Sequence, residues 1–575
     1  MAGDSHQQLE RARALHQQGM LAEAGTMYRK ILRRKPDSFE ALHLAGVLAL
    51  QTGRPAEGVE LIGKALRLDG GSAAVHCDLG AGLRALQRHA DALASYDRAI
   101  ALQPDHAEAH YHRAGVLAQL RREAEAVAGY DQAIALKPGY AEAYSNRGVV
   151  LANLQRHEEA LASFDRAIVL RPGYARAHYN RAKLLAELQQ PADALASYDQ
   201  AIALREDDAE AYCNRGVVLA GMQRNEAAVE SFDRAIALRP DYAAAHWNQG
   251  LCWLALGRLD LGWKLFEWRK RLPMPLGNRT FPQPVWLGRE SIAGKTLFIH
   301  WEQGFGDTLQ FCRYAGMVRA LGAQVVMSVQ DPLLRLIGTL GAGVEVVGGD
   351  ERPAAFDFHC PMMSLPLALG TTLETVPGPL RYLSVDPAAV AAWRGRMAGL
   401  AGLRVGLCWA GNALRPSPSA RLLDRRRSVG LAQLAPLAGV LGVQFVSLQK
   451  GDAAAQAAAP DVGVSLHDWT DELGDFADTA ALIEALDLVI TVDTSVAHVA
   501  GALGKPVWIL NRFDGCWRWL LDRDDSPWYP TARLFRQPAP GDWDSVIAAV
   551  AAALRGVAGG ALGGGATVWG ARATG

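Results

Sequence analysis

Two short segments of this chain carry side chains that could do chemistry. The first, EQGFGD at residues 302–307, follows the apolar run LFIHW and precedes a helical pattern. Gly304 and Gly306 permit a tight turn there, and the carboxylate of Asp307 is of the type that takes a proton from an attacking hydroxyl. The alternative is structural, because an aspartate at the start of a helix is also a good cap.

The second segment, DTSVAH at residues 493–498, lies between the apolar run LDLVITV and another helical stretch. A helix N-terminus offers unpaired N–H groups and a positive dipole end, which suit a diphosphate. The hydroxyls of Thr494 and Ser495 add donors, and His498 shares a helix face with Thr494. The alternative is that Asp493 or Thr494 caps the helix and the histidine is a surface residue.

Both segments follow elements typical of an α/β fold. Short apolar runs bounded by glycine alternate with helical stretches, as parallel strands covered on both faces do. Ligands bind beyond the carboxyl ends of such strands, where both segments lie. We predict two Rossmann-like lobes facing a cleft, the first at 294–390 and the second at 391–555. A flexible, glycine- and alanine-rich tail follows at 556–575.

The N-terminal half is a repeat with a period of 34 residues. Small residues recur in one column, aromatic or large aliphatic residues in a second, and prolines in a third. This pattern predicts an all-α helix-turn-helix superhelix of about eight units over 7–272 and resembles tetratricopeptide repeats. A linker with four prolines, 273–293, separates the repeats from the strands.

The two chemical segments together resemble glycosyltransferase family 9, the heptosyltransferase-like enzymes of the two-lobed type called GT-B. GFGD and DTSVAHVAGALGKPVWIL carry the resemblance, although Ser495 stands where the family usually has glycine. It implies that Asp307 is the general base, and that Asp493, Thr494 and His498 hold the diphosphate of a sugar nucleotide. The family mechanism would be inverting and metal-independent.

A further segment resembles a WxGN…DRxRS pattern of repeat-fused members. The residues concerned are Asn412, Arg425, Arg427 and Ser428, and the resemblance implies that they contact phosphate. One position departs from the family, since Lys450 stands where an acidic residue usually holds the ribose. The nucleotide and the sugar therefore stay open.

A column of asparagines in the repeats indicates an acceptor site. The residues recur one repeat apart along the face of the first helices, and their amides can pair with the backbone of an extended peptide: Asn146, Asn180, Asn214 and Asn248. The alternative is a solvated polar face copied by duplication. A neighbouring column, beginning at Arg113 and Arg147, could select acidic acceptors or pair with neighbouring glutamates.

Composition and residue spacing argue against nucleic-acid binding, a membrane span and a metal cofactor. Lys plus Arg number 59 against 60 acidic residues, so no basic field favours nucleic acid. The seven cysteines are scattered, which is typical of reduced thiols in a cytoplasm, and no run is long and apolar enough to span a membrane. An Asp-x-Asp at Asp522 and Asp524 lacks a preceding apolar strand, so we expect neither a metal nor another cofactor.

These observations predict a cytoplasmic glycosyltransferase that uses a nucleotide-sugar donor and a protein or peptide acceptor recruited by the repeats. Two alternatives remain. One is a protein-interaction scaffold whose transferase domain is inactive, and the other is a transferase acting on an envelope glycan. The second would need a membrane-facing basic or amphipathic element, which we do not see in the sequence.

Overall fold

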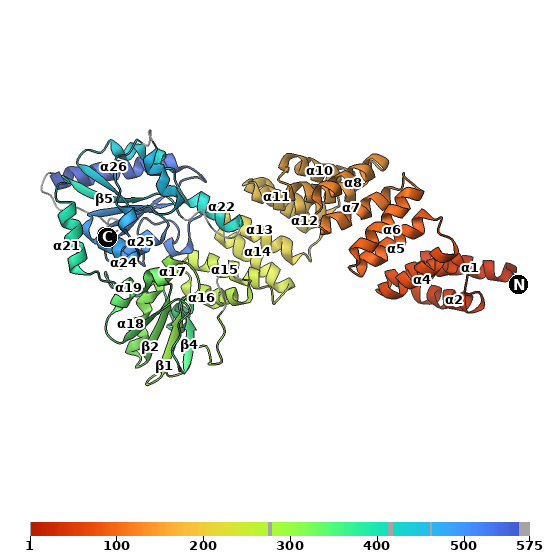
Figure 1. Ribbon diagram of the computed structural model, residues 1–575, viewed down its shortest axis with the longest axis horizontal. Coiled ribbons are helices and arrows are strands. Elements are labelled where there is room, and N and C mark those ends of the chain that lie inside the picture. The colour runs from red at the N-terminus through yellow and green to blue at the C-terminus, as the bar shows by residue number, and fades with distance from the viewer. Residues whose placement is uncertain (1, 274–278, 412–417, 460–462, 563–575) are drawn as a thin grey trace. The chain divides into compact units, whose positions relative to one another are not determined.

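The computed structural model describes the whole chain except residues 1, 274–278, 412–417, 460–462 and 563–575. It divides into two compact units, residues 1–215 and 216–575 (Figure 1). Each unit is considered by itself below.

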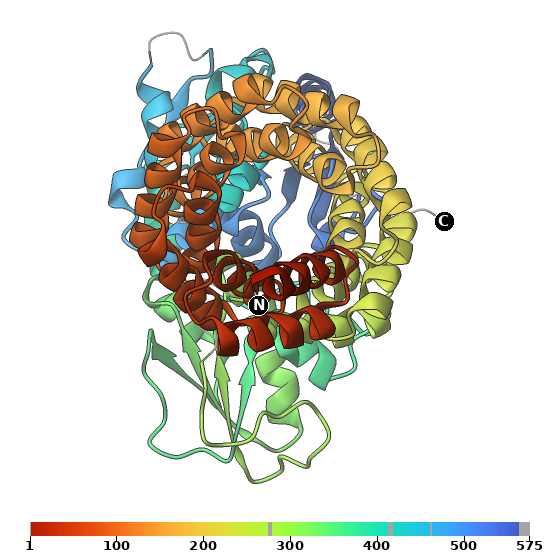
Figure 2. The ribbon, with the colours of Figure 1, turned by 90° about the vertical axis from the view of Figure 1, so that its right-hand side faces the viewer.

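Paired helices build the first unit, and they lie in two layers along a curved path (Figure 2). The small column and the aromatic column pack on each other, as the sequence predicts: a Cβ added at Gly148 would lie 2.6 Å from the ring of Phe164. The helices are α1 (Ala2–Gln17), α2 (Leu21–Arg34), α3 (Phe39–Gln51), α4 (Pro55–Leu68), α5 (Ala73–Ala85), α6 (His89–Leu102), α7 (Ala107–Gln119), α8 (Glu123–Leu136), α9 (Ala141–Asn153), α10 (His157–Leu170), α11 (Ala175–Glu187) and α12 (Pro191–Leu204).

The second unit begins with the last repeats and continues into two parallel sheets. Helix α13 (Ala209–Gly221) spans the division and is followed by α14 (Asn225–Leu238), α15 (Ala243–Ala255), α16 (Leu259–Phe266) and the 3₁₀ turn η1 (Glu267–Arg271). The first sheet has the order β3-β2-β1-β4. Its strands are β1 (Thr296–His300), β2 (Gln324–Val329), β3 (Val344–Gly348) and β4 (Phe358–Pro361).

The second sheet has six parallel strands in the order β10-β9-β8-β5-β6-β7. Apolar runs of the sequence overlap seven of the strands, and these runs lie at 295–301, 323–329, 344–348, 403–409, 443–449, 486–492 and 505–510. Strands β4, β7 and β10 are additional. The strands are β5 (Leu403–Cys408), β6 (Val443–Ser447), β7 (Leu466–His467), β8 (Leu488–Val492), β9 (Val507–Asn511) and β10 (Ala532–Arg536). The parallel α/β character predicted for this half is therefore confirmed.

Helices connect the strands of both sheets. Around the first sheet lie α17 (Phe305–Phe311), α18 (Ala315–Ala320), α19 (Leu334–Ile337) and α20 (Leu365–Ala368). Helix α21 (Pro387–Arg396) leads to the second sheet, which is accompanied by α22 (Pro418–Arg427), α23 (Ala435–Ala438), α24 (Phe476–Ala485), α25 (Ser495–Ala502) and α26 (Trp543–Leu562). Because α26 continues to Leu562, residues 556–562 are helical, although the sequence assigned them to the tail.

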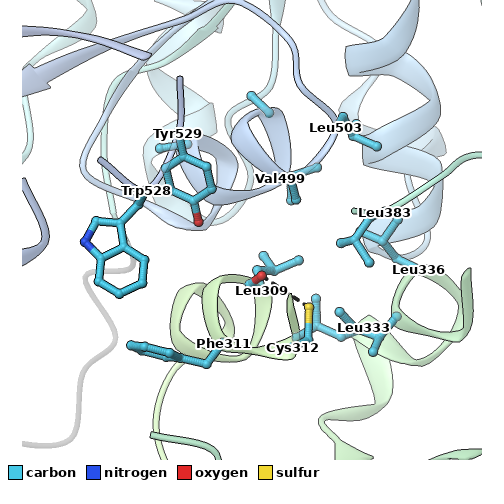
Figure 3. Close-up of a cluster of buried hydrophobic side chains, with 14 of the residues drawn as sticks. Leu309, Phe311, Cys312, Leu333, Leu336, Leu383, Val499, Leu503, Trp528 and Tyr529 are labelled. Carbon is cyan, nitrogen blue, oxygen red and sulfur yellow. Dashed lines mark hydrogen bonds between the residues drawn. The ribbon is translucent and has the colours of Figure 1, made fainter. Parts of the chain in front are cut away.

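A shared core joins the two sheets through α17 and α25. Figure 3 shows Leu309 and Phe311 on the α17 side and Val499 and Leu503 on the α25 side, with Tyr529 beside them. All five side chains are buried in one cluster. The turns at the starts of these two helices, which hold the two chemical segments, are thereby brought together.

The last repeat also packs into this core. Trp263 lies edge-on to Trp517 with ring centroids 5.2 Å apart, and its Nε1 donates to the carbonyl of Thr371. The buried Arg269 donates 2.7 Å bonds to Glu267 and Glu302. The last repeats consequently belong to the second compact unit, which begins at Gly216.

Candidate functional site

The turn after β1 holds Asp307 in two structural contacts. Its Oδ2 accepts a 2.9 Å bond from the Gly304 N–H, so Asp307 closes the first turn of α17. Its Oδ1 accepts from Arg518, which reaches across from the loop after β9. The carboxylate is 18% exposed. Asp307 is thus held in place from both sides and keeps one limited opening to solvent.

The two chemical segments meet at Gly306 and His498. A Cβ added at Gly306 would lie 2.7 Å from His498 Cδ2, closer than real Cβ atoms come, so only glycine fits. His498 Nδ1 lies 2.8 Å from the Tyr529 hydroxyl, and the ring stacks on Trp519 at 5.7 Å. If the hydroxyl donates to Nδ1, the proton of the neutral ring is on Nε2.

His498 is neutral at ordinary pH. Burial holds its pKa well below the usual range, and the positive charges of Arg518, Arg313 and Arg427 lower the pKa further. The side chain is only 5% exposed. His498 therefore packs between α17 and α25, against Gly306.

The N-terminus of α25 has no side-chain cap. Thr494 occupies the N-cap position, yet its hydroxyl lies 3.1 Å from Thr491 Oγ1 and makes no capping bond. Within the described ranges, no hydrogen bond engages the N–H groups of Ser495 and Val496. Uncapped N–H groups at the positive end of a helix dipole are suited to an anion.

The loop after β5 is supported by residues that the sequence assigned to phosphate. Arg427 donates to buried Asp424 at 2.6 Å and to the Asp493 carbonyl at 3.0 Å, which ties α22 to the end of β8. Ser428 Oγ accepts from the Gly411 N–H at 3.1 Å. These two residues shape the carboxyl edge of the sheet beside α25.

The other predicted donor residues lie elsewhere or outside the described residues. Lys450 is exposed and donates to the carbonyl of Leu473. Arg425 lines a pocket at the ends of β9 and β10 that contains none of residues 493–498. Asn412 lies outside the described residues.

Sequence reasoning missed Arg518 and Gln449. Arg518 lies between Trp517 and Trp519, and nothing in the neighbouring sequence points to its partner Asp307. Gln449 is buried, and its Oε1 accepts from the N–H groups of Trp409 and Ala410 at 3.0 and 2.8 Å. Its position directly after a strand could have identified Gln449 as a residue of the carboxyl edge, but only the adjacent Lys450 was considered from the sequence.

The asparagine column bridges neighbouring repeats. Asn146 donates to the Tyr111 hydroxyl and Asn214 to the Tyr179 hydroxyl, both at 2.9 Å, and Asn180 lies 3.5 Å from Ser145 Oγ. The side chain of Asn248 makes no hydrogen bond with a described residue. The first three asparagines therefore connect neighbouring repeats, whether or not they also bind an acceptor.

The arginine column pairs with aspartates of the preceding second helix. The distances are 2.6 to 2.7 Å for the pairs Arg113–Asp97, Arg147–Asp131, Arg181–Asp165 and Arg215–Asp199. Of the two interpretations of this column, pairing within the array is the one these contacts favour.

In the part of the chain that the structure describes, no three His, Cys, Asp or Glu side chains gather as metal ligands would. Among the same residues, no helix combines the length and apolar character needed to cross a membrane.

Family models match both halves of the chain. Tetratricopeptide repeat models match residues 9–73, 77–141, 141–174, 185–223 and 215–266. The model described as glycosyltransferase family 9 (heptosyltransferase) matches residues 474–510, which hold α24, β8, α25 and most of β9. The chain thus carries a tetratricopeptide array followed by a segment of the family 9 glycosyltransferases.

A curated relative is Protein FlbA of Caulobacter vibrioides, 32% identical over 328 residues that cover 52% of this chain and 53% of the relative. The chain therefore spans about half the length of this relative. Among solved structures, MamA is 25% identical with a TM-score of 0.28, covering 31% of this chain and 96% of that chain. YrrB, a TPR protein, is 26% identical with a TM-score of 0.29, covering 32% and 96%.

Proposed function

We propose that the protein is a glycosyltransferase of the GT-B type, which moves a sugar from a nucleotide-activated donor to a protein acceptor recruited by the repeats. The observation that carries the proposal is the uncapped N-terminus of α25, inside the segment matched to family 9 and beside the GFGD turn. The two N–H groups of Ser495 and Val496 and the helix dipole would hold the diphosphate.

The reaction is a displacement at the anomeric carbon. The acceptor oxygen forms a bond to that carbon while the bond to the diphosphate oxygen breaks, and the electron pair leaves with the diphosphate. Asp307 accepts the proton of the attacking hydroxyl. Its contact with Arg518 holds the carboxylate in place, and the α25 N-terminus stabilises the leaving group without a metal. Attack opposite to the leaving group inverts the anomeric configuration.

The acceptor enters through the repeat array in this proposal. Tetratricopeptide arrays present extended surfaces to partners, and the last repeat is packed against the α17–α25 core through Trp263 and Phe266. An acceptor held on the repeats of the second unit would therefore be held on the same compact unit as Asp307.

One observation favours the scaffold alternative. Asp307 and His498, the residues of the chemical segments with the clearest roles, both have structural partners, in Arg518 and in Tyr529 with Gly306. A domain that had lost its activity could keep these residues for packing alone.

A panel of nucleotide sugars separates the two functions. For an enzyme, at least one donor raises the melting temperature of the full chain, because a ligand at about 100 times its Kd stabilises by about 2.7 kcal/mol. Asp307→Asn should then lower transfer by about 10² to 10⁴ while the donor still binds. If no donor shifts the melting temperature, the proposal of a transferase is rejected and the scaffold is favoured.

A further inference from the structure

A second basic pocket lies at the carboxyl edge of the six-stranded sheet. Helix α22 contributes Arg425 and Arg426, the loop after β9 contributes Arg512 and Asp514, and the loop after β10 contributes Gln537. Trp543, at the start of α26, closes one side. The cavity has a volume of about 150 Å³. Four separate elements therefore converge on one small space lined by three arginines.

The charges that line this pocket do not balance. Asp514 forms an ion pair with Arg426, and the Oδ1 of Asp514 also lies 3.1 Å from Arg512 Nε. Arg425 makes no ion pair with any residue that the structure describes, and Asp514 is the one acidic residue among the described lining residues. Three guanidinium groups thus face one carboxylate, so the lining carries a net charge of about two positive units, and Arg425 is the one of the three without an ion pair among the described residues.

One of the lining side chains, Gln537, has a hydrogen-bond donor without a partner among the described residues. Gln537 is 5% exposed, and its Oε1 accepts from the N–H groups of Phe513 at 3.0 Å and Gly541 at 3.3 Å. These two donors determine the orientation of the amide. Nε2 is then left buried with no hydrogen-bond partner in the described part of the chain. Such a group costs about 1 to 3 kcal/mol unless an acceptor from outside satisfies it.

We propose that this pocket binds a phosphoryl group. Arginine forks and an amide N–H from three directions suit the several oxygens of a tetrahedral anion. The volume is below the roughly 300 Å³ at which pockets begin to hold whole drug-sized ligands, so a single phosphoryl group fits and a complete nucleotide does not. Neither Asp307 nor any of residues 493–498 lines the pocket, so the site is additional to the proposed diphosphate position.

The test is isothermal titration of the full chain with inorganic phosphate, at an ionic strength kept constant with chloride. Arg425→Gln should weaken phosphate binding about tenfold or more, because it removes a charge-assisted bond. Arg425 is exposed, so the variant should fold. Arg421→Gln removes the same charge one turn earlier on α22, outside the lining, and should leave the affinity within about twofold.

A nucleoside diphosphate titrated into the same variants identifies the source of the phosphoryl group. If Arg425→Gln weakens both ligands, the pocket takes a phosphate of the nucleotide. If it weakens inorganic phosphate alone, the pocket serves a separate phosphate or phosphomonoester. Both results support a phosphoryl site. An unchanged phosphate affinity in Arg425→Gln, an equal loss in Arg421→Gln, or no phosphate binding by the unaltered chain would each overturn the inference.

Discussion

The backbone N–H of Ser495 can be removed without disturbing the helix that carries it. Ser495 is the first residue of α25, the position at which proline is favoured in helices. The preceding Thr494 has φ −135° and ψ 176°, an extended conformation that a following proline accepts. We therefore expect Ser495→Pro to fold with a melting temperature close to that of the unaltered chain.

The loss of this donor should be seen in diphosphate binding. The N–H has no partner among the described residues, so its hydrogen bond to a bound diphosphate would be an added, charge-assisted interaction. Such bonds contribute about 1.5 to 3 kcal/mol, which corresponds to a rise in Kd of about 10- to 100-fold. Isothermal titration with the nucleoside diphosphate of the best donor measures the change.

Ser495→Ala is the matched control, since it removes the hydroxyl and keeps the N–H. The ratio of the two Kd values isolates the backbone donor from the side chain. If the proline and alanine variants bind the diphosphate equally well, the α25 N-terminus is not the diphosphate site. A joint loss of binding and of melting temperature in the proline variant would instead show that the helix had been disturbed.

Three further predictions concern packing and charge. Gly306→Ala should lower the free energy of unfolding by about 1 to 3 kcal/mol because its Cβ would meet His498 at 2.7 Å, whereas Gly304→Ala, with its nearest contact at 3.5 Å, should change it little in denaturant titrations. Asn146→Ala should lower it by about 1 kcal/mol by breaking the bond to Tyr111, and an equal effect of Asn248→Ala would contradict the bridging role. Burial, with the nearby His359, lowers the pKa of His300 to about 3, so only the unfolded chain binds this proton as the pH falls from about 6.5. Stability should therefore fall by up to about 1.4 kcal/mol per pH unit in that window, and a His300→Gln variant that unfolds in urea with the same pH slope would refute this.

The repeat half could be predicted because its contacts are close in sequence. Gly148 packs on Phe164, 16 residues away, and a small residue and an aromatic residue stand at the same spacing one period to either side, as Ala114 with Tyr130 and Ala182 with Tyr198. The repeated columns therefore indicate which residues pack on each other. The strands could be predicted for a related reason, since a parallel strand buried on both faces must be a continuous apolar run. The packing of the last repeat on the α/β part of the chain could not be predicted. Trp263 and Arg269 contact residues far away in the sequence, and no repeat column records such contacts.

The positions of Asp307 and His498 beyond the ends of strands followed from the sequence alone, because strand and helix patterns determine where such turns fall. The sequence alone did not predict which side chains contact Asp307 and His498. Arg518 pairs with Asp307 across 211 residues and Tyr529 with His498 across 31, and such pairs leave no period or spacing in the chain. The strand order and the α17–α25 packing decide them, since only tertiary structure brings two βα turns from different sheets within contact distance.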